Sequence, residues 1–199
     1  MTRGRPRKTD PNEVLETSMK VFWEKGYDAT SMNDLVAATG MAKPGLYANF
    51  GDKETLFNTA LTHYVKILGN QMEEDLATST DPLPVVIRRY LETVANANLD
   101  PDGPCGCFFV NSLVESSHAP ETTEKLTRRL DAERRQALVD RFRRARAAGE
   151  LPADVDTEAL GEFFAGQVLA LAVMARSGID RQASERFINV AMTALPDKN

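Results

Sequence analysis

Two cysteines, Cys105 and Cys107, are separated by one glycine and are the most reactive side chains of this 199-residue sequence. Pro104 is typical of a first helical residue, so we expect both thiols in a helical first turn, where the helix dipole lowers a thiol pKa. Three interpretations are open: inert buried thiols, a sensor of electrophiles or oxidants, and a soft-metal site with His118. The chain has only one other histidine, His63, so a complete zinc site within one chain is not expected. We predict no metal and no cofactor.

A second group of residues, between positions 43 and 50, is suited to hydrogen bonding with nucleic acid. Lysine and asparagine can donate to phosphates or base edges, and tyrosine can donate to a phosphate. If this segment is a short helix, Leu46 and Phe50 point to a core and the other side chains face solvent. These outward residues are Lys43, Pro44, Gly45, Tyr47, Ala48 and Asn49.

The first eight residues hold four cations, Arg3, Arg5, Arg7 and Lys8, and no acid. Pro6 disfavours a helix there, and an extended arginine-rich segment suits a narrow, electronegative minor groove. A disordered, solubilising tail is the alternative, and the two are compatible if the segment becomes ordered on DNA.

Composition limits the class of protein. The chain is 42% hydrophobic and 27% charged, which excludes a disordered or collagen-like chain. Its net charge is −5, but residues 1–66 hold nine Lys and Arg against eight Asp and Glu, so the acidity lies in the remainder. We find no signal peptide, no apolar run of the ~18 residues that span a membrane, and no hydrolase or nucleotide-binding motif. We therefore expect a cytoplasmic protein that is neither an enzyme nor membrane-bound.

Helical periodicity runs through the whole chain and predicts an all-α fold of about nine helices. Leu15, Met19 and Phe22 form an apolar stripe in the first of them, and Pro and Gly cluster at element ends. The expected helices cover residues 11–25, 31–39, 43–50, 52–78, 82–97, 104–116, 120–148, 157–176 and 180–195.

Two short helices behind a longer one, joined by a glycine-containing turn, describe a helix-turn-helix unit at about residues 31–50. The run from Val21 to Ser31 (VFWEKGYDATS) and the run from Leu35 to Phe57 (LVAATGMAKPGLYANFGDKETLF) closely resemble the TetR family of transcriptional regulators. The resemblance covers about residues 10–68. It implies a basic arm at 1–9, a DNA-binding domain at 10–52, and a ligand-binding and dimerisation domain at 53–199.

The resemblance also implies which residues meet DNA. Phosphate contacts are expected from Thr30 or Ser31, Tyr47, Asn49 and Lys53. Groove contacts are expected from Lys43, Pro44, Gly45 and Ala48, with the arginine-rich arm in an adjacent groove. Asn49 departs from the histidine or tyrosine that many members carry at its position.

The body is expected to dimerise and to bind an effector. Residues 160–174 are apolar almost all round, so this helix must be buried on more than one side, and the last helix adds further apolar residues. Two such helices per subunit could form a four-helix interface in a dimer. The alternative is that these apolar residues form the core of a monomer. The expected interface residues are Phe163, Gly166, Ala170, Phe187, Val190 and Ala191, and the expected pocket residues are Cys105, Cys107, Phe108, Phe109, Asn111 and Phe164.

The sequence therefore predicts a homodimeric regulator, most simply a repressor that a small-molecule effector releases from a pseudo-palindromic operator in double-stranded DNA. One alternative is a thiol, electrophile or soft-metal sensor that acts through Cys105 and Cys107 with the same DNA head. A second is an effector-free DNA-binding protein whose body only dimerises.

Overall fold

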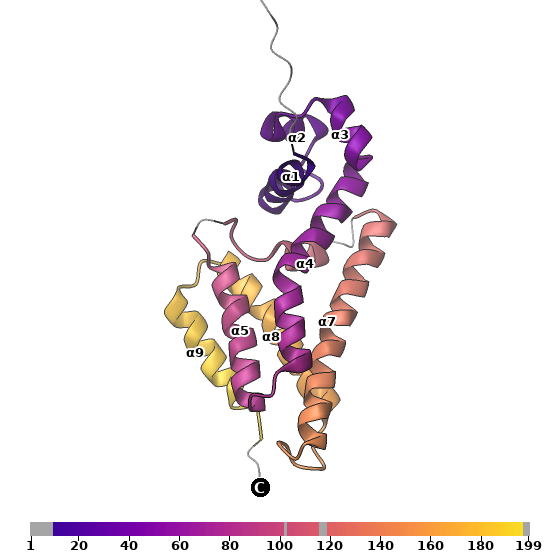
Figure 1. Cartoon of the computed structure of the whole chain (residues 1–199). Coiled ribbons are helices and arrows are strands. Elements are labelled where there is room, and N and C mark those ends of the chain that lie inside the picture. Colours follow the sequence, from indigo (N-terminus) through magenta and orange to yellow (C-terminus); the bar gives the residue numbers. More distant parts are fainter. Residues whose placement is uncertain (1–9, 102, 116–118, 197–199) are drawn as a thin grey trace, which may run out of the picture.

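Figure 1 shows the chain as an all-helical protein, in a computed structural model that describes residues 10–101, 103–115 and 119–196. These residues form nine helices and no strand, as the periodicity predicted. The helices are α1 (Pro11–Lys25), α2 (Met32–Thr39), α3 (Lys43–Phe50), α4 (Lys53–Thr78), α5 (Leu83–Asn98), α6 (Phe108–Glu115), α7 (Glu121–Ala147), α8 (Thr157–Arg176) and α9 (Arg181–Met192).

The helices α1, α2 and α3 form a small head on top of a larger body, and α4 runs from the head into the body (Figure 1). Phe22, Leu35, Leu46 and Leu56, one from each of these four helices, are fully buried together. Burying such a side chain contributes about 1.5–3 kcal/mol. The head is therefore held on the start of α4 by a shared core.

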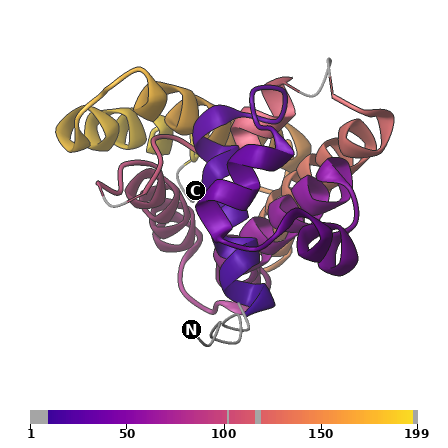
Figure 2. The ribbon, with the colours of Figure 1, turned by 90° about the horizontal axis from the view of Figure 1, so that it is seen from above.

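The body has its own core, in which Phe142 of α7 and Phe164 of α8 stack with ring centroids 5.5 Å apart. Seen from the head end, α1 lies over the middle of the body, with α5 and α9 to one side and α7 to the other (Figure 2). Leu76 near the end of α4 belongs to this second core. The helix α4 therefore contributes to both cores and joins the head to the body.

Local capping sets most helix ends where the sequence places them. Ser31 caps α2 in a reciprocal box: its hydroxyl accepts from the Asp34 amide, and the Asp34 carboxylate accepts from the Ser31 amide. Gly40 ends α2 in the left-handed conformation, with φ of 67°. Asp52 caps α4 by accepting from the Thr55 amide at 2.8 Å.

The sixth helix begins later than predicted, at Phe108 instead of residue 104. Gly106 has φ of +82°, which a right-handed helix does not tolerate, and its amide donates to the Asn98 carbonyl at the end of α5. Residues 104–107 are therefore a loop tied to α5. The prediction of two thiols within a helical first turn is wrong.

The expectation that no segment is long and apolar enough to cross a membrane also needs correction. By length and composition α8 passes that test, with a mean hydropathy of 1.4 over its most apolar 18 residues. In the structure Phe164, Val168 and Leu171 of α8 are buried in the body core. An apolar helix in this position is what a helical core requires.

Candidate functional site

The outward face of α3 is the first candidate site. Leu46 is buried beneath it, whereas Lys43, Pro44, Tyr47, Ala48 and Asn49 are exposed and Gly45 is half-buried. No side chain caps the start of α3, so its positive N-terminal end and Lys43 coincide on the surface. The head thus presents a short helix whose polar and small side chains are free to enter a groove.

Two residues expected at phosphates instead have partners inside the head. Thr30 is 1% exposed, and its hydroxyl donates to the Gly26 carbonyl at 2.7 Å. Lys53 donates to the Tyr27 and Thr30 carbonyls at 2.9 and 3.0 Å and lies 4.1 Å from the centroid of the Tyr27 ring. Both side chains hold the turn between α1 and α2 against the start of α4. Ser31 is therefore a better candidate than Thr30 for a phosphate contact.

Ser31 and Asn49 are exposed but already make hydrogen bonds. The Ser31 hydroxyl donates a hydrogen bond to the Asp34 carboxylate, which also forms a salt bridge with Lys25 at 2.7 Å. The hydrogen bonds from Lys25 and Ser31 hold the pKa of Asp34 well below its usual range, so a negative charge stands beside this helix end. The Asn49 amide donates back to the Gly45 carbonyl at 2.7 Å. The predicted arm residues Arg3, Arg5, Arg7 and Lys8 lie outside the described residues.

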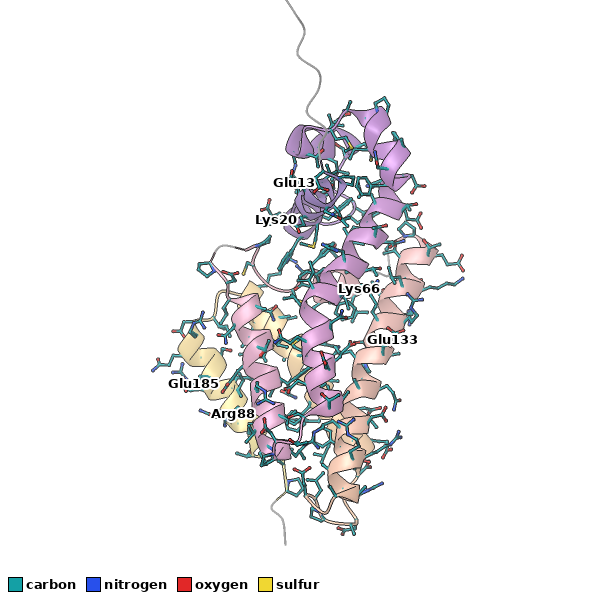
Figure 3. All side chains as sticks on the ribbon, in the orientation of Figure 1. Glu13, Lys20, Lys66, Arg88, Glu133 and Glu185 are labelled. Atoms are coloured by element: carbon teal, nitrogen blue, oxygen red, sulfur yellow. The ribbon has the colours of Figure 1, made fainter. Side chains whose placement is uncertain are left out.

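A cavity of about 90 Å³ in the body is the second candidate site. Its walls come mainly from α4 and α5, with further residues from α7. In Figure 3, Lys66 marks α4 and Glu133 marks α7. The lining is apolar apart from a few side chains. The cavity is lined by Tyr64, Val65, Leu68, Gly69, Met72, Glu73, Tyr90, Thr93, Val94, Ala97, Asn98, Cys107, Phe109, Leu130, Arg134 and Val168.

The structure places two of the six expected pocket residues, Cys107 and Phe109, on this cavity. Phe164 is instead fully buried in the body core, and Cys105 is exposed, with its thiol donating to the Ala175 carbonyl at 3.2 Å. Phe108 and Asn111 line a much smaller void beneath the head. The expected pocket is therefore displaced toward α4 and α5.

Cys107 connects the cavity wall to α4. The Tyr64 hydroxyl donates to the Cys107 sulfur at 3.4 Å. Burial raises the pKa of the Cys107 thiol above its ordinary value, the opposite of the lowering expected from a helix N-terminus. Among the described residues no group of three metal-binding side chains occurs, and His118 of the proposed soft-metal site lies outside them.

An aromatic cluster joins this cavity to the head. Trp23 of α1 packs edge-on against Tyr64 at 4.9 Å and stacks with Phe108 of α6 at 6.3 Å. Phe108 also meets Tyr64 at 5.7 Å and Phe57 at 5.4 Å. Tyr64 thus touches the cavity on one side and a head helix on the other, so the packing of one depends on the other.

The outer faces of α8 and α9 carry exposed apolar side chains. Phe163, Val173 and Val190 are 40%, 55% and 71% exposed. Gly166 of α8 is also exposed, and apart from its chain neighbours and its own helix backbone no described atom lies within 4 Å of where its Cβ would be. Of the other expected interface residues, Ala170 and Phe187 are half-buried, whereas Ala191 is buried within the chain itself.

The sequence analysis missed most of the polar cavity residues, although the pattern held a signal for two of them. Asn98 continues the buried stripe of α5 that runs through Tyr90, Leu91 and Val94. Arg134 lies one turn from Leu138 on the buried side of α7, with its side chain 11% exposed. A polar residue on an apolar stripe marks either a structural hydrogen bond or a site.

Comparison with known proteins agrees with this architecture. The sequence profile of the bacterial regulatory proteins of the tetR family matches residues 14–60, and that of the tetracyclin repressor-like C-terminal domain matches residues 83–191. The HTH-type transcriptional repressor ComR of Escherichia coli (strain K12) is 31% identical over 98% of this chain and 91% of its own.

Solved structures show the same fold. A cysteine mutant of the TetR family regulator CifR, complexed with double-strand operator DNA, has a TM-score of 0.85 and 30% identity over 97% of this chain and all of its own. AibR, in complex with isovaleryl coenzyme A and operator DNA, has a TM-score of 0.72 over 92% of this chain and 96% of its own, and at 21% identity it supports the fold alone. The chain belongs to the TetR family of transcriptional regulators, which bind operator DNA and are not enzymes.

Proposed function

We propose that this chain is a cytoplasmic, homodimeric repressor that leaves a pseudo-palindromic operator when a small molecule occupies the cavity between α4, α5 and α7. The observation that carries the proposal is Tyr64, which lines the cavity and also packs on Trp23 of the head. Repression is the activity that the name of the 31% identical relative ComR gives to that protein.

Two α3 helices related by a two-fold axis are needed to contact both half-sites, about 34–36 Å apart. The exposed apolar residues of α8 and α9 support a second copy of the chain as the partner that brings them together. We place Phe163, Gly166, Ala170, Phe187 and Val190 at this contact. Ala191 stays within the subunit, since it is 5% exposed.

DNA contact is assigned to the exposed face of α3 and to the basic arm. Lys43, Pro44, Gly45 and Ala48 are placed toward base edges, and Tyr47 toward a phosphate. A plot of log affinity against log salt concentration should have a slope of roughly −0.9 per phosphate neutralised. Because these contacts are few, we expect a modest total slope. The acidic body, which is not expected to touch DNA, limits nonspecific coating.

The cavity couples to the head through α4. An occupant that displaces Tyr64 alters its packing on Trp23 and Phe108, and α4 carries this change to the end of α3 and the head core. A coupling of about 1–3 kcal/mol changes operator affinity by roughly 5- to 150-fold. This range is sufficient to release DNA.

Filling the cavity tests the proposal. Ala97 is half-buried at the cavity wall on α5, and Ala97→Leu keeps a good helix former while occupying the space. Small molecules retained by the purified wild-type chain from a cell extract would be identified by mass spectrometry and then added to operator complexes. We expect them to release the wild type and to leave Ala97→Leu bound; release of both proteins equally would contradict the proposal.

The thiol alternative keeps one supporting observation, the contact between Cys107 and Tyr64. The raised pKa of the Cys107 thiol argues against a thiol sensor, because the thiolate is the reactive form. Operator affinity measured before and after a mild electrophile, with Cys107→Ser as the control, separates the two mechanisms. Loss of affinity that Cys107→Ser abolishes would favour the thiol sensor.

We predict that exposed Cys105 is alkylated before Cys107. The raised pKa of Cys107 makes its thiolate fraction at pH 7.5 smaller than that of an ordinary thiol, and Cys107 is half-buried whereas Cys105 is exposed. Mass spectrometry of peptides after brief treatment with iodoacetamide checks this order. Faster labelling of Cys107 would contradict the prediction.

A further inference from the structure

We propose that the occupant of the cavity is a small, uncharged and mostly apolar molecule with a carbonyl-type acceptor, and that Asn98 donates a hydrogen bond to it. The inference rests on the proposed effector role of the cavity and specifies its chemistry. Ketones, aldehydes, esters and amides share this acceptor.

Asn98 is the residue that carries the argument. It is 3% exposed, lies at the end of α5 and lines the cavity. Its Nδ2 atom is buried and has no hydrogen-bond partner within the described part of the chain. A buried donor left unpaired costs about 1–3 kcal/mol, so a ligand that offers an acceptor recovers energy that the empty protein has lost.

Arg134 adds a second donor to the same cavity. Its two terminal nitrogens are used, one on the Ala165 carbonyl at 2.9 Å and one on the Asp131 carboxylate at 2.6 Å. Its Nε atom is buried and has no partner among residues 10–101, 103–115 and 119–196. Asn98 and Arg134 thus each bring a buried donor atom without a partner to the lining of the same, mostly apolar cavity.

The charges around the cavity favour an uncharged ligand over a carboxylate. The Arg134 cation is already paired with Asp131, which also receives Arg135 at 2.6 Å. Glu73 lines the cavity as well, and burial followed by the charge of Glu133 raises its pKa. Glu73 is the carboxylate that an anionic ligand would meet on the cavity wall, whereas Arg134 is already bound to Asp131.

The size of the cavity limits the apolar part of the ligand. A cavity of roughly 150 Å³ holds benzene, and this one measures about 90 Å³. A molecule of about four or five non-hydrogen atoms is therefore the appropriate probe. Tyr64, Tyr90 and Phe109 supply the aromatic surface that its carbon atoms would contact.

Three probes of nearly the same shape separate the possibilities: butanone, 2-methyl-1-butene and propanoate. The first has a neutral acceptor, the second replaces the carbonyl by a methylene group, and the third is charged at pH 7.5. Binding to the full chain would be followed by methyl NMR of labelled methionines, because Met72 lines the cavity and reports on this site. The variant is Asn98→Leu, which keeps the number and branching of the side-chain heavy atoms and removes the donor.

We expect butanone to shift the Met72 signal, and Asn98→Leu to raise the ratio of the butanone Kd to the 2-methyl-1-butene Kd by about fivefold. The variant should unfold at the same temperature or higher, since it removes an unpaired donor; Asn98→Met serves the same cycle should the leucine variant not fold. A ratio unchanged within twofold, or tighter binding of propanoate than of butanone, overturns the inference. Neither result affects the release experiment with Ala97→Leu, which judges the effector proposal separately.

Discussion

Replacing Gly161 by alanine is expected to lower the free energy of unfolding by about 3 kcal/mol. A Cβ at this position of α8 would lie 2.4 Å from Cγ2 of Val139, and 2.8 and 2.9 Å from its Cα and backbone nitrogen. A side chain can move aside, but two of these three atoms belong to the backbone of α7. The helices would have to separate, and the body core that they share would lose packing.

Gly69→Ala in α4 is the matched control. A Cβ there would meet only Cγ1 of Val65 at 3.6 Å and Oε1 of Glu73 at 3.7 Å, which is ordinary contact. Alanine should then stabilise the helix by about 0.5–1 kcal/mol. Urea unfolding compares the two variants. The protein concentration is kept fixed, because the apparent stability of a dimer depends on it. Equal effects of both would show that the close approach of α7 and α8 does not exist.

Tyr47→Ala is expected to weaken operator binding by about 100-fold without unfolding the protein. A hydrogen bond to a charged phosphate contributes about 1.5 kcal/mol, and a dimer makes it twice. Tyr47 is 45% exposed, so its loss should cost the fold little. Fluorescence anisotropy with labelled operator measures the affinity, and circular dichroism confirms the helix content.

Two further variants make this result specific. Tyr47→Phe removes only the hydroxyl and should behave like alanine if the phosphate bond carries the effect. Val85→Ala, at an exposed apolar position on α5 with 48% exposure, should leave affinity unchanged. Full affinity of Tyr47→Ala would remove this residue from the interface.

Helix positions could be predicted from the sequence because the signals that set them are local. Asp10, Ser31, Asp52, Asp156 and Asp180 each accept from a backbone amide of the first turn of their own helix. The start of α6 depends on a contact with the preceding helix, since the Gly106 amide donates to the Asn98 carbonyl at the end of α5. The proline signal at residue 104 could not reveal that contact between the loop and α5.

The same division holds for the candidate site. The outward residues of α3 followed from helical periodicity, which also buried Leu46. The internal bonds of Thr30 and Lys53 depend on how α1, α2 and α4 pack, which periodicity does not specify. The cavity depends on the spacing of α4, α5 and α7, so its polar residues Asn98 and Arg134 could be suspected only from their place on buried stripes.

The central claim is that two heads, fixed by one dimer, bind two half-sites in register. Inserting five base pairs between the half-sites rotates one of them by about half a turn of B-DNA, which has about 10–10.5 base pairs per turn. Affinity of the full chain for the native and lengthened operators would be measured by anisotropy at one salt concentration. We predict a fall of about 10³-fold or more, to the level of nonspecific DNA. Equal affinity for both operators would contradict the account.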